Sequence, residues 1–261
     1  MKEIENNFLD SLDLDDSEII PFVPEILKDL WELGSIPKYI IELVEKHILP
    51  TQLKNVIDLG CGKGAVLIQL SERIKFEGVG IDIMPDFIIE ANKRSKQKPY
   101  AKNLKFEIGD IKNSMEKHHN FDLVIYGHDS DIFGNITQSL IEINKYSANN
   151  RWIILEAIYS INSTNNPDNL PNYKEFIQQL KESEFEIIEQ VNWNKNQLKQ
   201  VNSENTSLIS KQIKNLIKTN PNKEKMFTDY LKNQIEECHQ LENDITCLTI
   251  LLKNNSNVTQ Q

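Results

Sequence analysis

The feature that most constrains this chain is a glycine-rich turn that follows a short apolar run. The run Asn55-Val56-Ile57-Asp58 indicates a buried β-strand, and Ala65 to about Lys75 indicates a helix with one apolar face. Gly60, Gly62 and Gly64 lie between them. A glycine turn between a strand and a helix exposes backbone N–H groups and lets a ligand approach the main chain closely. The sequence therefore predicts a site for a nucleotide-like cofactor.

The spacing of the glycines fits two kinds of cofactor. Gly60-x-Gly62-x-Gly64 is the methyltransferase form, whereas Gly60-x-Gly62-x-x-Ala65 satisfies the dinucleotide fingerprint with alanine in the last place. Asp58, at the strand end, favours the first, because a carboxylate there would repel an anionic pyrophosphate. It suits the ammonium and sulfonium groups of S-adenosylmethionine, where a charge-assisted hydrogen bond contributes about 1.5–3 kcal/mol. The alternative is that Asp58 only ties down the amides of the loop.

Two further carboxylates follow the next two predicted strands. Asp82 ends the apolar run that starts at Gly78, and a carboxylate there accepts both ribose hydroxyls of either cofactor. In Gly109-Asp110-Ile111, after the third strand, the carboxylate can accept from an adenine amino group while apolar neighbours flank the ring. Asp110 could equally cap a helix or form a turn.

Short apolar strands alternate with helix-period segments from residue 36 to residue 160. Such alternation predicts βαβ units, a parallel sheet and right-handed crossovers. The expected strands are 55–58, 78–82, 104–108, 121–126 and 152–156, and two looser candidates follow at 185–193 and 244–253. The expected helices begin near Ser35 as an N-terminal cap and then cover 65–75, 85–96, 135–146 and 173–182, with an amphipathic pair at 195–242 that is broken at Thr219-Asn220-Pro221.

These segments together resemble the class I (Rossmann-like) S-adenosylmethionine-dependent methyltransferases. The motifs that carry the resemblance are Val56 to Gly64, Gly80-Ile81-Asp82-Ile83, Gly109-Asp110 and Phe121-Asp122-Leu123-Val124-Ile125. It covers residues 36–160 closely and the last two strand candidates loosely. The resemblance implies an α/β fold with three layers: a doubly wound, seven-stranded, mostly parallel sheet whose antiparallel last strand lies beside the sixth, with a helical insertion before that last strand.

The resemblance also implies roles for individual residues. Asp58 and the three glycines would hold the methionine moiety, Asp82 the ribose, and Asp110 with Gly109 and Ile111 the adenine. Leu59 and Ile83 would line the pocket, and Gly127 would border it at the end of the fourth strand. Lys63 stands where the family has a small residue, and we expect it to face solvent or to pair with a carboxylate. No metal is expected.

The acceptor side is expected in the loop that follows the fourth strand. His128 is the candidate base if the nucleophile must lose a proton, although it could instead pack against or cap the next helix. Asp129 and Asp131 could bind a cationic substrate or cap that helix. Glu156, at the end of the fifth strand, faces the same crevice of the sheet.

Composition restricts the acceptor to a narrower class. The formal charge is −10, and residues 1–35 carry ten acidic side chains against Lys2 and Lys28. A dense basic track for nucleic acid is lacking, as is the Asn/Asp-Pro-Pro-Tyr/Phe sequence of amino-methylating nucleic-acid enzymes. No apolar run reaches the roughly 18–20 residues of a membrane span, and three sparse cysteines favour a reducing compartment. We therefore expect a cytoplasmic enzyme for a small molecule, with the assembly, including a homodimer, left open.

The chain is expected to divide into an acidic helical cap segment (1–35), a methyltransferase domain (36–253) with a helical lid (195–242), and a frayed tail (254–261). We hypothesise that the leader folds over the cofactor, with Leu33-Gly34-Ser35 near its methionine end. The rival functions are an NAD-dependent oxidoreductase, a non-catalytic protein that binds S-adenosylmethionine or S-adenosylhomocysteine, and a methyltransferase for protein or RNA.

Overall fold

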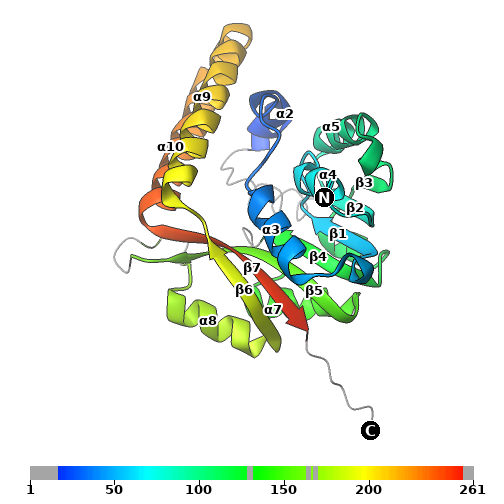
Figure 1. The fold of residues 1–261 in the computed structure, drawn as a ribbon. Helices are drawn as coiled ribbons and strands as arrows, with labels where there is room; N and C mark the ends of the chain where they lie inside the picture. The colour runs from blue at the N-terminus through cyan, green and yellow to red at the C-terminus, as the bar shows by residue number, and fades with distance from the viewer. Residues whose placement is uncertain (1–16, 128–131, 163–165, 167–169, 255–261) are drawn as a thin grey trace. The chain divides into compact units, whose positions relative to one another are not determined.

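The computed structural model describes residues 17–127, 132–162, 166 and 170–254 of the chain. The chain divides into two compact units. The sheet unit comprises Glu32–Ala157, Tyr173–Val191 and Leu248–Gln261, and the helical unit comprises Met1–Trp31, Ile158–Asn172 and Asn192–Cys247. Figure 1 shows the elements of both units.

The centre of the sheet unit is a seven-stranded sheet in the order β3-β2-β1-β4-β5-β7-β6. Its middle strands are apolar along nearly their whole length, as parallel strands covered on both faces must be. The strands are β1 (Asn55–Leu59), β2 (Glu77–Asp82), β3 (Leu104–Ile108), β4 (Phe121–Gly127), β5 (Ser147–Ser160), β6 (Phe185–Asn192) and β7 (Ile245–Asn254).

Strand direction follows from the pairings. β1 pairs with β2 and β4, β2 with β3, and β4 with β5, all parallel. β7 runs in the opposite direction to β5. The Ile161 amide, just after β5, donates to Asp244 O, just before β7. Glu156, five residues before Ile161, accepts from Thr249, five residues after Asp244. A pairing that moves in opposite directions along two strands is antiparallel. The predicted fold class, with β7 antiparallel between β5 and β6, is confirmed.

Helices cover both faces of this sheet. From β1 the chain continues outward to β2 and β3, and from β4 it continues outward to β5 on the opposite side of the sheet. Right-handed crossovers therefore place the helices after β1 and β2 on one face of the sheet and the helix after β4 on the other face. α3 packs with α4, and α7 with α8. The helices are α3 (Pro37–His47), α4 (Ala65–Ser71), α5 (Pro85–Lys96), α6 (Ile111–Met115), α7 (Ile136–Lys145) and α8 (Tyr173–Glu182), with short 3-10 turns η2 (Pro50–Gln52) and η3 (Pro99–Ala101).

Two helices depart from the sequence prediction, one in its N-terminal cap and one in its existence. Ser35 does not cap α3: Ile36 is the N-cap, it makes no side-chain hydrogen bond, and Pro37 occupies the first turn. The proline's fixed φ is sufficient there, because its missing N–H is one that the first turn would leave unpaired. α6 was not predicted, because five residues are too few to show a helical period.

The helical unit is built on two long antiparallel partners. α9 (Lys195–Thr219) and α10 (Glu224–Asn243) pack together and are separated by the turn η5 (Pro221–Lys223), so the predicted break at Thr219-Asn220-Pro221 is confirmed. η1 (Ser17–Phe22) and α2 (Val23–Ile26) belong to the same unit. Phe22 meets the fully buried Phe227 edge to face, with ring centroids 5.1 Å apart.

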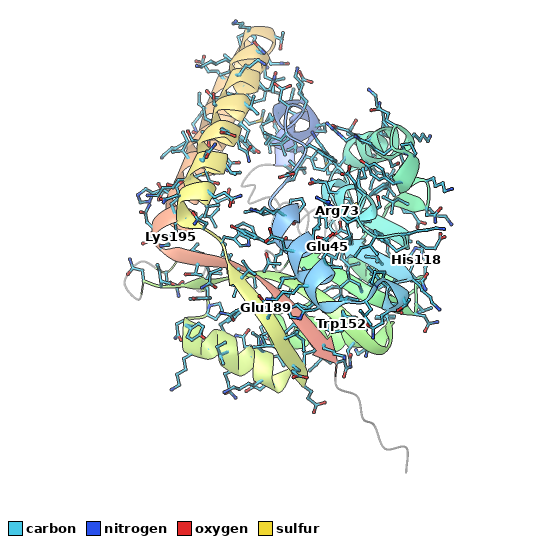
Figure 2. All side chains as sticks on the ribbon, viewed as in Figure 1. Glu45, Arg73, His118, Trp152, Glu189 and Lys195 are labelled. Carbon is cyan, nitrogen blue, oxygen red and sulfur yellow. The ribbon has the colours of Figure 1, made fainter. Side chains whose placement is uncertain are left out.

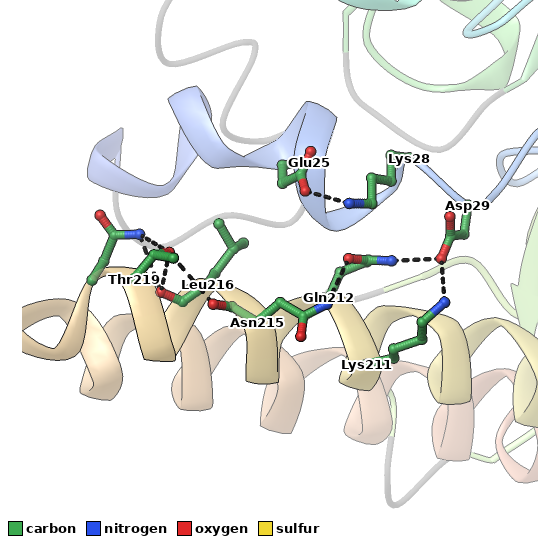
Figure 3. A network of polar contacts seen from close by, with 9 residues as sticks. Glu25, Lys28, Asp29, Lys211, Gln212, Asn215, Leu216 and Thr219 are labelled. Atoms are coloured by element: carbon green, nitrogen blue, oxygen red, sulfur yellow. Dashed lines mark hydrogen bonds and ion pairs between the residues drawn. The ribbon is translucent and has the colours of Figure 1, made fainter.

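Polar contacts also join α9 to the segment that follows α2. Asp29 accepts hydrogen bonds from Lys211 Nζ at 3.2 Å and from Gln212 Nε2 at 2.5 Å, as Figure 3 shows. These two donors lower the pKa of the Asp29 carboxyl. Residues 17–31 of the acidic leader therefore pack with α9 in one unit, while the predicted boundary at residues 35/36 stays a prediction.

Candidate cofactor site

The glycine turn lies at the carboxyl edge of the sheet. β1 ends at Leu59 and α4 begins at Ala65, so residues 60–64 connect them at the point where the strand order reverses. Gly60 and Gly64 have φ of 82° and 74°, a left-handed conformation that favours glycine. A Cβ on Gly64 would lie 2.7 Å from the Phe106 ring, whereas a Cβ on Gly60 would meet only Ile111 at 4.0 Å. Gly64 therefore serves packing, and Gly60 offers open backbone.

Four of the five amides of this turn are already used within the protein. Gly60 and Cys61 both donate to Ile81 O, at 2.9 and 2.8 Å, and Gly64 donates to Cys61 O at 2.9 Å. Gly62 donates to Asp82 Oδ2 at 2.8 Å. A pyrophosphate-binding turn needs such amides free for the phosphate oxygens. The hydrogen bonds therefore disfavour a dinucleotide, a discrimination that the glycine spacing could not make.

Asp58 is a buried carboxyl group with an unused oxygen. Its side chain is 4% exposed, and Oδ2 has no hydrogen-bond partner among the described residues. Burial, together with the carboxylates of Glu156 and Asp82, raises the pKa of Asp58 to about 8. The alternative role, in which Asp58 ties down the amides of the loop, is not supported by the four amides above, whose acceptors lie elsewhere. A buried acceptor of this kind suits a ligand that brings a cationic N–H donor.

Both carboxyl oxygens of Asp82 accept hydrogen bonds from the backbone. Its two oxygens accept from the amides of Gly62 and Met84, both at 2.8 Å, so the side chain ties the glycine turn to the end of β2. Burial raises the pKa of this carboxyl, and the two amide bonds oppose that rise. A carboxylate has about four lone-pair sites, so two remain for hydroxyl donors such as those of a ribose.

The residues expected around the adenine and in the pocket walls lie at the ends of β1, β2 and β3. Asp110 caps α6: its Oδ1 accepts from the Asn113 amide at 3.0 Å, which is the capping role left open by the sequence. Gly109 donates to Asp82 O at 3.0 Å, which holds the ends of β3 and β2 together. Ile111 lies near Gly60, Ile83 is half-buried, and Leu59 is buried.

On the other half of the edge, Gly127 and Glu156 are neighbours. Gly127, the last residue of β4, is the register partner of Glu156. Glu156 was expected at the end of the fifth strand, but β5 continues for four more residues, to Ser160. Glu156 is 7% exposed and accepts from Thr249 Oγ1 of β7 at 3.2 Å. Thr249 was missed in the sequence, where its one signal is a hydroxyl that interrupts the apolar residues Leu248–Leu252. In the described part of the chain, no three His, Cys, Asp or Glu side chains are arranged to hold a metal ion.

Lys63 differs from one expectation. Its side chain is 1% exposed, and Nζ lies 3.1 Å from Glu90 Oε2 and 5.7 Å from the Phe87 ring centroid. The prediction that Lys63 faces solvent is therefore wrong, and the alternative, pairing with a carboxylate, is confirmed. α5 presents Phe87 and Glu90, one turn apart, to the glycine turn, and this packing depends on tertiary structure.

The candidate base His128 and the acidic residues Asp129 and Asp131 lie outside the described residues.

Two other histidines pair with carboxylates: His118, labelled in Figure 2, with Glu107 at 3.0 Å, and His47 with Glu189 at 2.5 Å. Lys46 and His47 lower the pKa of Glu189, so this contact joins the end of α3 to β6.

Fold and site together define a class I, S-adenosylmethionine-dependent methyltransferase. The site fits a cofactor with an ammonium group and a ribose. Asp58 has an oxygen without a partner among the described residues, four amides of the glycine turn are occupied, and Asp82 has lone pairs left for hydroxyl donors. The family model for a methyltransferase domain matches residues 50–244, and the chain belongs to that family.

Solved structures agree with this class. The S-adenosylmethionine-dependent methyltransferase from Thiobacillus denitrificans, in complex with S-adenosylhomocysteine, has a TM-score of 0.71 at 15% identity and covers 88% of this chain and 97% of that one. The corresponding complex from Geobacter sulfurreducens has a TM-score of 0.71 at 14% identity, with 89% and 96% covered. At these identities the likeness shows the fold.

A curated relative matches over a shorter stretch. Aklanonic acid methyltransferase DauC of Streptomyces sp. (strain C5) is 35% identical over 78 residues, which are 29% of this chain and 35% of that protein. The match thus spans about a third of the length of the relative. Within the described residues, no helix is both long and apolar enough to cross a membrane.

Proposed function

We propose that this chain transfers the methyl group of S-adenosylmethionine to a small-molecule nucleophile and releases S-adenosylhomocysteine. The observation that carries the proposal is the pairing of a buried, unpartnered Asp58 oxygen with a glycine turn whose amides are taken. A cationic ligand, which needs few free backbone N–H donors, fits this combination. A pyrophosphate, whose oxygens need several such donors, does not fit it.

In this proposal each part of the edge holds one part of the cofactor. Asp58, with the turn formed by Gly60, Gly62 and Gly64, holds the methionine moiety. Asp82 uses its remaining lone pairs for the ribose hydroxyls. Gly109, Asp110 and Ile111 border the adenine, Asp110 with the lone pairs that its capping bond leaves over, and Leu59 and Ile83 form apolar walls.

The cofactor, when bound, supplies an activated methyl group on its sulfonium. The chain's contribution is then mainly to hold the acceptor in line with that methyl group and to exclude water, because effective molarities of about 10⁵ M or more follow from such positioning. A base is needed only where the acceptor must lose a proton, and His128 is our candidate. Gly127 would border the cofactor pocket, and Asp129, Asp131 and Glu156 would form the acceptor half.

Several observations support a small-molecule acceptor. The chain lacks a dense basic track and the Asn/Asp-Pro-Pro-Tyr/Phe sequence, and its formal charge is −10. DauC is, by its name, a methyltransferase for aklanonic acid. We further propose a cytoplasmic location, while a homodimer stays compatible with every observation above.

The end of the leader supports part of the cap hypothesis. Leu33 Cδ1 lies 3.4 Å from the point where a Cβ of Gly62 would stand. We therefore propose Leu33 as an apolar wall at the methionine end of the site. Removal of residues 1–33 is expected to weaken binding of S-adenosylhomocysteine, and an unchanged affinity would exclude this role.

The decisive test is thermal unfolding with competing ligands. At a hundredfold excess over the dissociation constant, a ligand of the native state adds about 2.7 kcal/mol. For a chain of this size that raises the midpoint by roughly 5–10 °C. We expect this rise with S-adenosylhomocysteine and none with NAD; the opposite pattern would support the oxidoreductase.

Two variants sharpen the test. Asp58→Asn should weaken S-adenosylhomocysteine binding roughly tenfold to hundredfold, the loss of one charge-assisted hydrogen bond. Asp229→Asn, which changes an exposed carboxylate of α10, is the matched control and should bind normally. Binding without methyl transfer to any nucleophilic acceptor in a broad panel would instead identify a non-catalytic binding protein.

A further inference from the structure

Three carboxyl groups lie toward the carboxyl edge of the sheet, on β1, β2 and β5. Asp58 is 4% exposed, Glu156 is 7% exposed, and Asp82 is half-buried; both neighbours act electrostatically on Asp58. Charges of one sign in a buried site repel each other strongly, so such a cluster keeps a proton rather than ionise fully. The following inference rests on the proposed function and concerns the same site.

The hydrogen bonds identify the group that keeps the proton. Asp82 is stabilised as an anion by two backbone amides at 2.8 Å. Glu156 accepts from the hydroxyl of Thr249 at 3.2 Å. For Asp58 Oδ2 the described residues provide no donor at all. The carboxyl group with the least stabilised anion is therefore Asp58.

Within the described part of the chain, the elements around Asp58 supply no cation to offset this. β2 contributes Asp82 and β5 contributes Glu156. The glycine turn contributes Cys61, a thiol whose pKa burial and the two aspartates raise, so it is neutral. β4 places Ile125 in register with Asp58. Lys63, in the same turn, pairs with Glu90 at 3.1 Å.

We propose that Asp58 and Glu156 form a carboxyl pair that keeps one proton in the ligand-free site and releases it to solvent when the cofactor's ammonium group binds. The exchange is balanced: one positive charge leaves as H⁺ and another arrives on the nitrogen, so the charge of the buried pair is compensated in both states. Glu156 is a positioning residue here, since it acts through the ionisation of Asp58.

The consequence is a cofactor affinity that depends on pH. Protons and the ligand's ammonium group compete for the same carboxylate, so the affinity for S-adenosylhomocysteine should rise with pH by up to tenfold per pH unit below the midpoint near pH 8. Above that midpoint the rise should end, because Asp58 is then ionised before the ligand arrives.

The test is isothermal titration calorimetry of the full chain with S-adenosylhomocysteine. Titrations at pH 7 in buffers with different ionisation enthalpies give the number of protons released. We expect about one proton per site for the wild-type protein. 5′-Methylthioadenosine, which has the adenosine and sulfur but no ammonium group, should bind without proton release. Equal release with both ligands, or none with S-adenosylhomocysteine, would overturn the proposal.

Two variants assign the proton. Asp58→Asn should abolish the release where binding persists, because an amide cannot ionise. Glu156→Gln should shift the midpoint of the pH profile of cofactor affinity to lower pH, since one of the two neighbouring negative charges is gone. A purely structural role of Glu156 would leave that midpoint in place and would remove Glu156 from the proposal.

The outcomes separate this inference from the proposed function. If S-adenosylhomocysteine does not bind at all, the methyltransferase assignment of the site is at fault. If it binds tightly with no proton released between pH 6 and pH 8, the assignment holds and the carboxyl pair is refuted. The comparison of the two ligands uses only the wild-type protein, so it remains decisive even if a variant fails to fold.

Discussion

At the scale of single residues, Asp58 illustrates a conflict between stability and binding. A carboxyl group that is buried without a donor costs free energy in the ligand-free protein, and the cost grows when the group must ionise. The same absence of an internal donor, among the described residues, leaves the oxygen available to a ligand. In the proposed site, ligand binding at this position would therefore use a hydrogen bond that Asp58 Oδ2 does not make with the described residues.

This conflict predicts a pH-dependent effect of Asp58→Asn on stability. The pKa of Asp58 is raised to about 8, above its value in the unfolded chain. The folded state then binds more protons than the unfolded state between about pH 4 and pH 8, so its stability falls as the pH rises through that range. The fall is on the order of 5 kcal/mol in total.

An asparagine in place of Asp58 carries no charge at any pH, so the variant should escape this loss. Urea unfolding without ligand should find Asp58→Asn close to the wild type at pH 5 and clearly more stable at pH 9. The difference between the two proteins removes the contribution of the other titrating groups. A difference that is equal at the two pH values would contradict the assigned environment of Asp58.

Residue types and spacing selected the candidate carboxylates but did not indicate how they are hydrogen bonded. Asp58, Asp82 and Glu156 could be selected because each ends an apolar strand. The occupation of the loop amides by Ile81 O and Asp82 depends on the register of β1 against β2, which the sequence does not contain. The burial of Lys63 likewise depends on Glu90, 27 positions along the chain, being brought close by α5.

At the scale of elements, the turn between β1 and α4 is held by close packing. Gly64→Ala would place a methyl group 2.7 Å from the Phe106 ring at a φ of 74°. Gly34→Ala has nearly the same φ, 78°, but meets nothing within 4 Å. The pair therefore separates backbone strain, about 1–2 kcal/mol, from overpacking, typically a further 1–3 kcal/mol.

Chemical unfolding of both variants measures the two contributions. We expect Gly34→Ala to lower the free energy of unfolding by about the strain alone and Gly64→Ala to lower it by clearly more. Equal losses would mean that Phe106 moves aside without cost. Binding of S-adenosylhomocysteine should weaken in Gly64→Ala, because the turn forms part of the proposed site.

Prediction of elements succeeded where local signals were strong. α5 has the predicted bounds, Pro85–Lys96, because a proline at its first position and a regular apolar period mark it. Asn135 caps α7 by accepting from the Gln138 amide, which agrees with the predicted start. β5 was predicted too short at both ends, as 152–156 instead of Ser147–Ser160. At its start, residues 147–151 are mostly polar and carry no strand pattern, and at its end the strand continues four residues past Glu156.

At the scale of the whole molecule, the two compact units should differ in how they open. Phe227 is fully buried in the helical unit against Phe22, so Phe227→Ala should remove about 3–5 kcal/mol from that unit. Hydrogen exchange should accelerate in α9 and α10, while β1, β2 and β4 keep their protection. Ile235→Ala, which truncates an exposed side chain of α10, is the control and should change little.

If Phe227→Ala accelerates exchange equally in both units, the units unfold as one cooperative body. The sequence foresaw α9 and α10 from their apolar periods but could not assign residues 17–31 to the same unit. That assignment depends on contacts such as Asp29 with Gln212, which are nearly two hundred positions apart in the chain.

The position of β7 in the sheet has a consequence for biosynthesis. β7 lies between β5 and β6, yet it follows both along the chain. During translation β3, β2, β1, β4 and β5 can pair as soon as they leave the ribosome, whereas β6 has no neighbouring strand until β7 emerges. Its polar edge groups stay hydrated during that interval, while the 25-residue α9 and 20-residue α10 are synthesised. The closing step of sheet assembly is therefore an insertion between two existing segments rather than an addition at an edge.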